Sequence, residues 1–352
     1  MSLHHLARNL RPRKFGDVVG QEISVRLIKK ALINNMMLPV CTIFGPSGTG
    51  KTTLARLMAL WQCCTNRHED EPCGTCANCT AIISDTHPDV YELDAGTYTS
   101  VEDVKNMLEG TGYSASPMNL NGKKIYILDE VHMLSRHAIT ALLKRFEEPM
   151  DGLQFILATT NVEKLPDTIL SRSFQIRLDS VQPSDMKEYI LQICRSNSYE
   201  IQEASIESII YASYGSVRQS LSYLEQAAIL GDGKISHQVV TDMLGMASKD
   251  IVHLLLDAIY KYDVDQMLRS LEGLNIKPLM LLKQLLSEIQ SRIKSGKANA
   301  EEIKLGYGLA EASVLMHKAP YSDNILEICI GYVISMNKPE PKRLADLAKE
   351  LF

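Results

Sequence analysis

Short apolar runs alternate with amphipathic segments over the first half of the chain. Residues 39–60 read as an apolar strand, a glycine-rich turn and a helix, and residues 123–134 hold an apolar run that ends in two acids. Further strand-like runs occupy residues 89–96, 153–160 and 174–179. Helical patterns separate these runs at 21–34, 101–113 and 137–149. Strands that alternate with helices predict an α/β fold, a parallel sheet with helices on both faces.

The pattern changes after Pro183, where the strand signal disappears and helical spacing continues. Helical stretches lie at 184–196, 203–215 and 216–230, and a further helical block runs toward Phe352. We therefore predict three parts, listed in chain order: an α/β core over residues 1–179, a small helical lid domain over 180–245 and an all-helical domain over 246–352.

Composition limits the ligands and the cellular compartment that are expected for the chain. Its 352 residues are 45% hydrophobic and 22% charged, with a net charge of −5, so any contact with nucleic acid requires a local basic face. The sequence contains no run of eighteen apolar residues and no signal-peptide pattern at its basic N-terminus. A cytoplasmic protein without membrane contact is expected. Thiols stay reduced there, so clustered cysteines favour a metal over disulfides.

A glycine-rich loop follows the first predicted strand and opens a helix. It fits the phosphate-binding pattern, in which glycines turn backbone N–H groups toward a phosphate chain. Lys51 would face the β- and γ-phosphates, and the Thr52 hydroxyl would ligate Mg²⁺. A glycine turn used only for packing is the alternative, but strand, loop and helix occur here in the required order. The predicted nucleotide-binding residues are Gly45, Pro46, Ser47, Gly48, Thr49, Gly50, Lys51, Thr52 and Thr53.

Two carboxylates, Asp129 and Glu130, end another predicted strand. Behind a phosphate loop, such a pair can divide the work: one carboxylate would hold Mg²⁺ through water and the other would polarise the attacking water. Idle, solvated acids are the alternative. Thr160 ends the next strand, where a polar side chain could orient that water or sense the γ-phosphate, although a simple strand end would look the same.

Two arginines are further candidates. Arg172 precedes the last predicted strand, and an arginine can stabilise charge on a transferring phosphoryl group, in some enzymes from a neighbouring subunit. Arg218 lies in the first turn of a later helix, where a cation needs a partner, which could be a bound nucleotide. A surface arginine and a salt bridge are the respective alternatives.

Five of the eight cysteines fall within residues 63–79. Cys73, Cys76 and Cys79 have the spacing C-x-x-C-x-x-C, and with Cys64 they can close a tetrahedral zinc site. Cys63 could replace Cys64 as the fourth ligand. An iron–sulfur cluster and metal-free cysteines are the alternatives. A closed site of this kind would hold a short polar loop, about residues 63–80, that has no core of its own.

With these motifs in order, the chain resembles the gamma/tau subunits of bacterial DNA polymerase III, the AAA+ ATPases of the sliding-clamp loader. The stretches that carry the resemblance cover residues 1 to about 245. The most specific are "LARNLRPRKFGDVVGQE" at 6–22, "GPSGTGKTTLAR" at 45–56, "PCGTCANC" at 72–79, "KIYILDEVHMLS" at 124–135, "LPDTILSRS" at 165–173 and "GSVRQSLSYLEQA" at 215–227. The resemblance implies a structural zinc module on an ATPase core, and it identifies the last helical block as a collar domain.

The resemblance also assigns roles by position. It implies that Ala7, Arg11 and Pro12 pack near the adenine, that Asp129 and Glu130 are the metal-coordinating and catalytic acids, and that Thr160 and Arg218 are the first and second sensors. Arg172 matches an arginine finger that serves the neighbouring subunit's ATP, in trans. Two positions depart from the family: Ser173 replaces the usual cysteine, and Asn161 stands where aspartate is commoner.

The function implied is an ATP-hydrolysing motor of the clamp loader, which is not itself the polymerase catalytic subunit. Its cofactors would be ATP, Mg²⁺ and Zn²⁺. Its partners would be delta, delta-prime and further gamma/tau copies, the sliding clamp, and primer-template DNA contacted through phosphates. The chain ends without the proline-rich tail of longer family members, so a short form is expected that does not bind the helicase or polymerase.

Two alternatives belong to other functional classes. The first is a structural, delta-prime-like subunit that does not hydrolyse ATP, against which the intact Lys51, Thr52 and Glu130 argue. The second is another AAA+ DNA-remodelling ATPase, such as a branch-migration motor. The cysteine insert and the "SRS" segment at 171–173 argue against that class.

Overall fold

The computed structural model describes residues 6–97, 102, 104, 107, 115–116, 119, 122–147, 152–261, 263–271, 276–296 and 300–316. The chain forms two compact units, one of residues 1–199 and 209–229 and the other of residues 200–208 and 230–352. The division into parts 1–179, 180–245 and 246–352 stays a prediction. The helix predicted at 101–113 lies largely outside the described residues.

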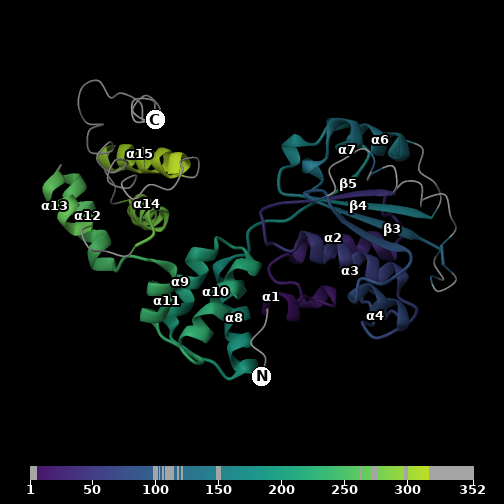
Figure 1. Ribbon diagram of the computed structural model, residues 1–352, viewed down its shortest axis with the longest axis horizontal. Helices are drawn as coiled ribbons and strands as arrows, with labels where there is room; N and C mark the ends of the chain where they lie inside the picture. Colours follow the sequence, from purple (N-terminus) through teal and green to yellow (C-terminus); the bar gives the residue numbers. More distant parts are fainter. Residues whose placement is uncertain are drawn as a thin grey trace. The chain divides into compact units, whose positions relative to one another are not determined.

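A five-stranded sheet forms the centre of the first unit (Figure 1). In spatial order its strands are β2 (Val90–Asp94), β3 (Lys124–Asp129), β4 (Leu153–Thr159), β1 (Val40–Phe44) and β5 (Phe174–Arg177). All four pairings are parallel. The predicted α/β class with a parallel sheet is confirmed.

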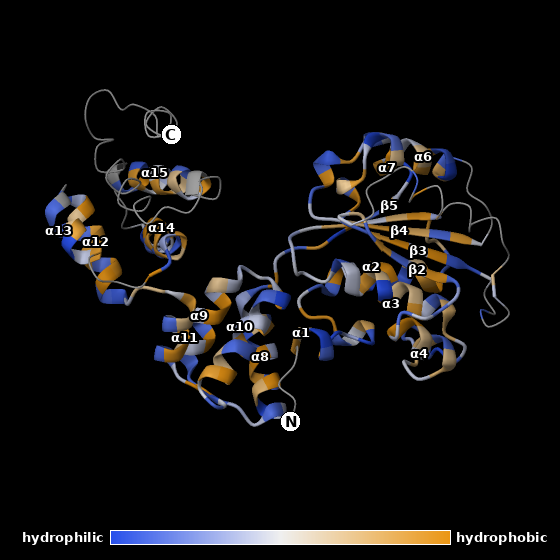
Figure 2. Ribbon diagram, viewed as in Figure 1, coloured by the Kyte–Doolittle hydropathy of each residue, from blue (hydrophilic) through white to orange (hydrophobic). Residues whose placement is uncertain are grey.

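Helices cover both faces of this sheet, which explains why its central strands read as continuous apolar runs. On one face Ile125 and Ile127 pack in the same core as α2 (Glu22–Ile33), α3 (Lys51–Cys63) and α4 (Ala77–Ile83). On the other face Tyr126 and Leu128 pack with α6 (Arg136–Glu147) and α7 (Asp167–Leu170). The central strands are accordingly mostly hydrophobic in Figure 2.

Helix α3 runs from the glycine-rich loop to the cysteines. It begins after Gly50, whose left-handed backbone (φ 108°) caps it, and Cys64 ends it in an extended conformation. Eleven of its thirteen residues are buried, which is typical of a helix packed on all sides. The sequence stretch after the loop therefore forms a helix enclosed by the core, with its two ends at the two candidate sites.

Helices make up most of the rest of the described chain. They are α8 (Pro183–Asn197), α9 (Glu203–Ser213), α10 (Val217–Leu230), α11 (His237–Leu244), α12 (Lys249–Tyr260), α13 (Val264–Leu271), α14 (Pro278–Lys294) and α15 (Ala300–Met316). Helices α12 to α15 share an apolar core centred on Leu255, Leu281 and Leu309. Within the residues described, none of the helices has the length and apolar character needed to cross a membrane.

One pair of strands in this helical part was not predicted. β6 (Glu200–Ile201) and β7 (Lys234–Ile235) pair in parallel in the second unit. Each strand has only two residues, which is too short for an alternating pattern to appear in the sequence.

Candidate active site and cysteine cluster

The glycine-rich loop follows β1 at the carboxyl edge of the sheet and packs closely against neighbouring residues. Gly45 has φ 150°, and a Cβ there would lie 2.2 Å from the Leu178 carbonyl oxygen. Gly48 has φ 75°, and a Cβ there would lie 2.0 Å from the Ser216 hydroxyl oxygen. The two positions therefore require glycine because other backbone and side-chain atoms approach them closely.

Lys51 is the first residue of α3 and is 6% exposed. Its Nζ donates to the carbonyl oxygens of Gly45 and Pro46, at 3.0 and 2.9 Å. Burial lowers the pKa of Lys51, the nearby Glu130 and Asp129 carboxylates oppose this effect, and Arg218 adds to it. The ammonium group thus donates to two neutral carbonyl oxygens, and an anionic phosphate oxygen would be a stronger acceptor.

Thr52 and Asp129 lie in direct contact, although 77 positions separate them in the sequence. The Thr52 hydroxyl donates to Asp129 Oδ2 at 2.6 Å. Parallel strands bring their carboxyl ends to one edge of a sheet, so the start of α3 after β1 meets the end of β3 there. A hydroxyl and a carboxylate side by side are oxygen ligands of the kind that Mg²⁺ prefers.

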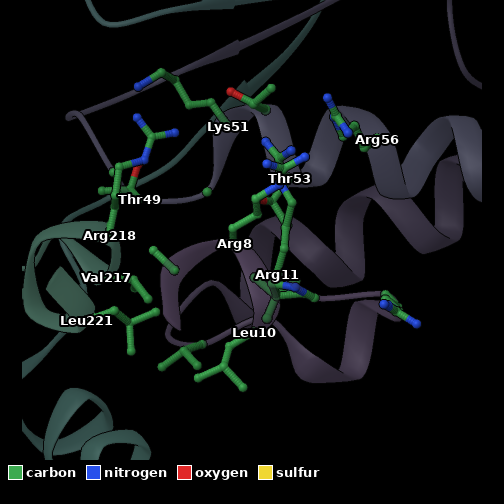
Figure 3. A pocket seen from close by; sticks show the side chains of 18 of the residues that line it. Arg8, Leu10, Arg11, Thr49, Lys51, Thr53, Arg56, Val217, Arg218 and Leu221 are labelled. Carbon is green, nitrogen blue, oxygen red and sulfur yellow. The ribbon is translucent and has the colours of Figure 1, made fainter. Parts of the chain in front are cut away.

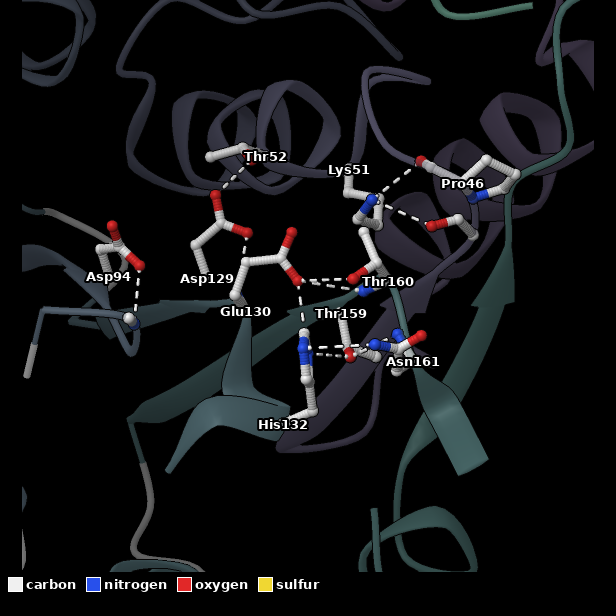
Figure 4. A network of polar contacts seen from close by, with 12 residues as sticks. Pro46, Lys51, Thr52, Asp94, Asp129, Glu130, His132, Thr159, Thr160 and Asn161 are labelled. Atoms are coloured by element: carbon white, nitrogen blue, oxygen red, sulfur yellow. Dashed lines mark hydrogen bonds and ion pairs between the residues drawn. The ribbon is translucent and has the colours of Figure 1, made fainter. Parts of the chain in front are cut away.

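Glu130 follows β3 with its backbone in the left-handed region (φ 48°), which is uncommon for a residue other than glycine. Its Oε2 accepts from the Thr160 N–H at 3.1 Å and from the Thr160 hydroxyl at 3.0 Å. His132 Nδ1 lies 3.3 Å from the same oxygen (Figure 4). The strained backbone and the three polar contacts together fix the direction of the carboxylate.

His132 connects Glu130 to the end of β4. Its Nδ1 lies 2.9 Å from Thr159 Oγ1, and its Nε2 lies 3.4 Å from Asn161 Nδ2. The Asn161 amide nitrogen is a donor, and a tautomer with the proton on Nδ1 would leave Nε2 free to accept from it. In that tautomer the Nδ1–H would face both Thr159 Oγ1 and the Glu130 carboxylate. Sequence reasoning did not single out His132, because a histidine in a strand-end segment has no distinctive spacing.

A cavity of about 840 Å³ lies over the loop and the start of α3. Figure 3 shows Arg218 of α10 and Lys51 on one side of it, with Arg8 and Arg11 near Thr53 on another. Six cationic and three acidic side chains line it, an excess of positive charge suited to a polyphosphate: Arg8, Arg11, Arg13, Lys51, Arg56, Arg218, Asp85, Asp129 and Glu130.

Most of the predicted site residues line this one cavity. They are Ala7, Arg11, Pro12, Ser47, Gly48, Thr49, Gly50, Lys51, Thr52, Thr53, Asp129, Glu130 and Arg218. Gly45 and Pro46 are not in this lining, but their carbonyl oxygens accept hydrogen bonds from Lys51 Nζ. The backbone N–H of Arg218 also donates to the Gly48 carbonyl at 3.3 Å, so the start of α10 contacts the loop directly.

Arg8, Arg13 and Arg56 line the cavity but were not predicted, because an isolated arginine has no distinctive sequence pattern. Arg56 forms ion pairs with Asp85 at 2.8 Å and with Glu92 at 2.5 Å, which fix it on α3. Burial lowers the pKa of Arg11, as do the nearby charges of Arg56 and Arg218, against the opposing carboxylates. Arg11 is thus partly buried beside other cations, a setting that an anionic ligand would stabilise.

Arg172 is not among the residues that line the cavity. Its guanidinium forms an ion pair with Glu147 at 3.4 Å and donates to the Thr168 carbonyl at 3.0 Å. Both side chains of the pair are about half exposed, at 42% and 52%. The Arg172 guanidinium is therefore partly exposed to solvent, and it is not part of the lining of the chain's own cavity.

The cysteine cluster lies at the far end of α3. The sulfur atoms of Cys64, Cys73, Cys76 and Cys79 all lie within 4.8 Å of one another, a fit for one metal ion. Backbone N–H groups also point at these sulfurs, as from Cys73 to Cys64 Sγ and from Cys76 to Cys73 Sγ, each at 3.3 Å. Such donors stabilise thiolates. Between the two candidates for the fourth ligand, the structure brings Cys64 into the cluster.

Comparisons with known proteins identify the family of the chain. The family profile described as "DNA polymerase III, delta subunit" matches residues 20–182. The DNA polymerase III subunit gamma of Buchnera aphidicola subsp. Baizongia pistaciae is 37% identical over 264 residues, which cover 75% of this chain and 70% of the relative. The subunit tau/gamma of Haemophilus influenzae is 36% identical over 272 residues, 77% of this chain and 39% of that longer protein.

A looser similarity is seen among solved structures. The RuvB Holliday junction branch migration motor of Thermotoga maritima has a TM-score of 0.49 and 20% sequence identity, covering 82% of this chain and 91% of that chain. The DNA polymerase III subunits named above are 36% and 37% identical to this chain over about three quarters of its length. The chain belongs to the gamma/tau family of DNA polymerase III subunits, as its motifs predicted.

Proposed function

We propose that the chain binds ATP with Mg²⁺ in the cavity over the glycine-rich loop and hydrolyses it as a motor subunit of the clamp loader. The observation that carries the proposal is the contact of Thr52 with Asp129, beside Lys51 and an oriented Glu130. A loop that merely packs against a helix needs none of these side chains. Family membership supports the setting in DNA replication.

The roles follow from the chemistry of phosphoryl transfer. Lys51 neutralises charge on the β- and γ-phosphates. Thr52 and Asp129 would hold Mg²⁺, which supplies Lewis-acid stabilisation of the charge on the transferring group. Glu130 orients the attacking water and takes its proton, and Thr160 keeps the carboxylate in place. Arg218 reaches the cavity from α10 and would contact the phosphates.

Adenine would contact the N-terminal side of the cavity, at Ala7, Arg11 and Pro12. The cysteine cluster would hold Zn²⁺ in a structural role, since all four ligand positions are filled by protein. Arg172, exposed and paired only with Glu147 and a carbonyl among the contacts described, would complete the site of a neighbouring subunit. Delta, delta-prime and further gamma/tau copies, the sliding clamp and primed DNA are the proposed partners.

The test is the ATPase rate of the chain assembled with delta and delta-prime, with and without clamp and primer-template DNA. We expect DNA and clamp to stimulate hydrolysis and a Lys51→Ala variant to show none. ATP-independent assembly with no hydrolysis under any condition would favour the structural, delta-prime-like role. Hydrolysis that responds to DNA but never to the clamp would favour another class of DNA-remodelling ATPase.

A further inference from the structure

The cysteine insert carries a strongly acidic run at residues 69–71, which the glycine-rich loop does not account for. Glu71, the last residue of that run, reaches a segment 55 positions earlier in the chain. Its carboxylate accepts from the Phe15 N–H at 2.7 Å and from the Gly16 N–H at 3.0 Å. Its third partner is Lys29 of α2, with Nζ at 2.5 Å.

These contacts fix a turn in the N-terminal segment, and this turn lies between two stretches that line the cavity. Phe15 and Gly16 are the first residues of η1 (Phe15–Asp17), and the Phe15 side chain is buried in the core. Residues 10–13 and residues 18–19, on the two sides of this turn, line the nucleotide cavity. Holding the turn therefore holds both stretches, including Arg11.

The cysteine cluster in turn holds Glu71. Glu71 lies in the loop between Cys64 and Cys73, and the Cys73 N–H donates to Cys64 Sγ at 3.3 Å, which closes the loop. A tight backbone pairing of Glu71 with His68, at 2.7 and 3.0 Å, fixes the tip of the loop. A metal bound by both cysteines would secure the two ends and so the position of the carboxylate.

We infer that Glu71 is a positioning residue for nucleotide binding, through which the cysteine cluster holds the N-terminal wall of the cavity. The inference rests on the proposed nucleotide site. The insert then has a specific role, because metal in the cluster and nucleotide in the cavity stabilise each other. Coupling of this kind is reciprocal, so each ligand raises the affinity of the other by the same factor.

Asp70 provides a matched control for this role. It also pairs with Lys29, at 2.9 Å, and it is the neighbouring acid in the same loop. Unlike Glu71, it has no hydrogen bond to Phe15 or Gly16 among the contacts described. Glu71→Ala removes the hold on the turn, Glu71→Gln keeps one acceptor oxygen, and Asp70→Asn removes a similar charge without touching the turn.

The first measurement is the affinity for the fluorescent nucleotide mant-ADP, with zinc content and melting temperature followed in parallel. Two lost hydrogen bonds should weaken binding by about tenfold in Glu71→Ala, less in Glu71→Gln and hardly at all in Asp70→Asn. Equal affinity of Glu71→Ala and wild type would overturn the inference. So would equal losses in Glu71→Ala and Asp70→Asn, because charge on Lys29 would then explain both.

The second measurement is the zinc affinity against a competing chelator, with and without ADP. ADP should tighten zinc retention in the wild-type chain but not in Glu71→Ala.

Amide exchange at Phe15 and Gly16 gives a third test, which does not depend on the variants. Both amides should be protected in the zinc-loaded wild type and lose protection when zinc is stripped, and unprotected amides in the loaded chain would overturn the inference. A wild type that binds no mant-ADP would instead contradict the proposed nucleotide site.

Discussion

The backbone N–H and the side-chain hydroxyl of Thr160 donate to the same oxygen, Oε2, of the Glu130 carboxylate, at 3.1 and 3.0 Å. A carboxylate held by one oxygen keeps a fixed direction while its other oxygen can take the proton of a water molecule. Thr160 therefore orients Glu130, in addition to any contact it makes with a γ-phosphate.

The hydroxyl contribution can be isolated at Thr160. Thr160→Val removes one donor and leaves the backbone N–H, so kcat should fall on the order of tenfold while mant-ADP affinity stays near wild type. Thr160→Ser should restore most of the rate. Steady-state ATPase assays and a binding titration separate the two effects. A valine variant with the wild-type kcat would show that the hydroxyl is unimportant for Glu130.

His132 allows a similar test with two isosteric amides. Asparagine places its amide nitrogen near the position of Nδ1, which faces Glu130 and Thr159, whereas glutamine reaches the position of Nε2, which faces Asn161. If the N–H toward Glu130 matters, His132→Asn should retain more of the ATPase kcat than His132→Gln. The opposite order would assign the importance of His132 to its contact with Asn161.

Lys51 and Arg172 should fail in different ways. Lys51→Ala should lose nucleotide binding, because the phosphates lose their cation. Arg172 does not line the chain's own cavity, so Arg172→Ala should bind mant-ADP normally and lose DNA-stimulated hydrolysis, by roughly 10³-fold for a finger acting in trans. Binding titrations and ATPase assays on the assembled complex check both statements.

Mixing these two variants in one oligomer sharpens the test. An intact Lys51 site beside an intact Arg172 neighbour should recover part of the activity, since each defect lies in a different half of a shared site. The control is each variant assembled alone. Oligomers shown to contain both variants that recover no activity at any ratio would indicate that Arg172 does not act between subunits.

Adjacent cysteines test the metal cluster. Cys64→Ala should lower both zinc content, expected at about one per chain, and thermal stability, whereas Cys63→Ala should keep the zinc. Elemental analysis and a melting curve measure both. Cys63 is buried outside the cluster, so its substitution controls for the loss of a core sulfur. Iron in the purified protein would identify a different cluster.

Nucleotide binding should also take up protons in alkaline solution. Burial lowers the pKa of Lys51, and a bound phosphate would raise it again. When the bound pKa exceeds the free pKa, binding takes up protons, and affinity falls as pH rises through the lowered value. Calorimetry in two buffers of different ionisation heat detects this uptake. Lys51→Arg should show none, since arginine stays charged, and equal uptake in both proteins would assign it to another group.

The sequence predicted the parts of the site that parallel-sheet topology brings together. The glycine-rich loop, Asp129, Glu130 and Thr160 each follow or end a strand, and the carboxyl ends of parallel strands meet at one edge. It left Cys63 and Cys64 as alternatives, because two adjacent residues have nearly the same spacing to the other cysteines. The structure separates them, because Cys63 is the last residue of α3 whereas Cys64 follows it in an extended conformation and joins the cluster.

Other features depend on contacts that no local pattern encodes. The acidic run in the insert looks like a solvated loop, yet Glu71 meets Phe15 across 56 positions. The short helices α4 and α7 have seven and four residues, too few for a clear helical period. Arg218 could be proposed as a site residue, but its contact with Gly48 depends on how α10 packs against the loop.

Phe44 and Thr159, the last residues of β1 and β4, are register partners in the sheet. Each strand residue advances the chain by about 3.3 Å and reverses the face of every side chain beyond it. Deleting one residue from either strand would therefore move Lys51 relative to Thr160 and exchange the two faces of the strand. Changes in chain length should be tolerated in the loops that leave the opposite edge of the sheet, and these two strands should keep a constant length wherever the same chemistry is retained.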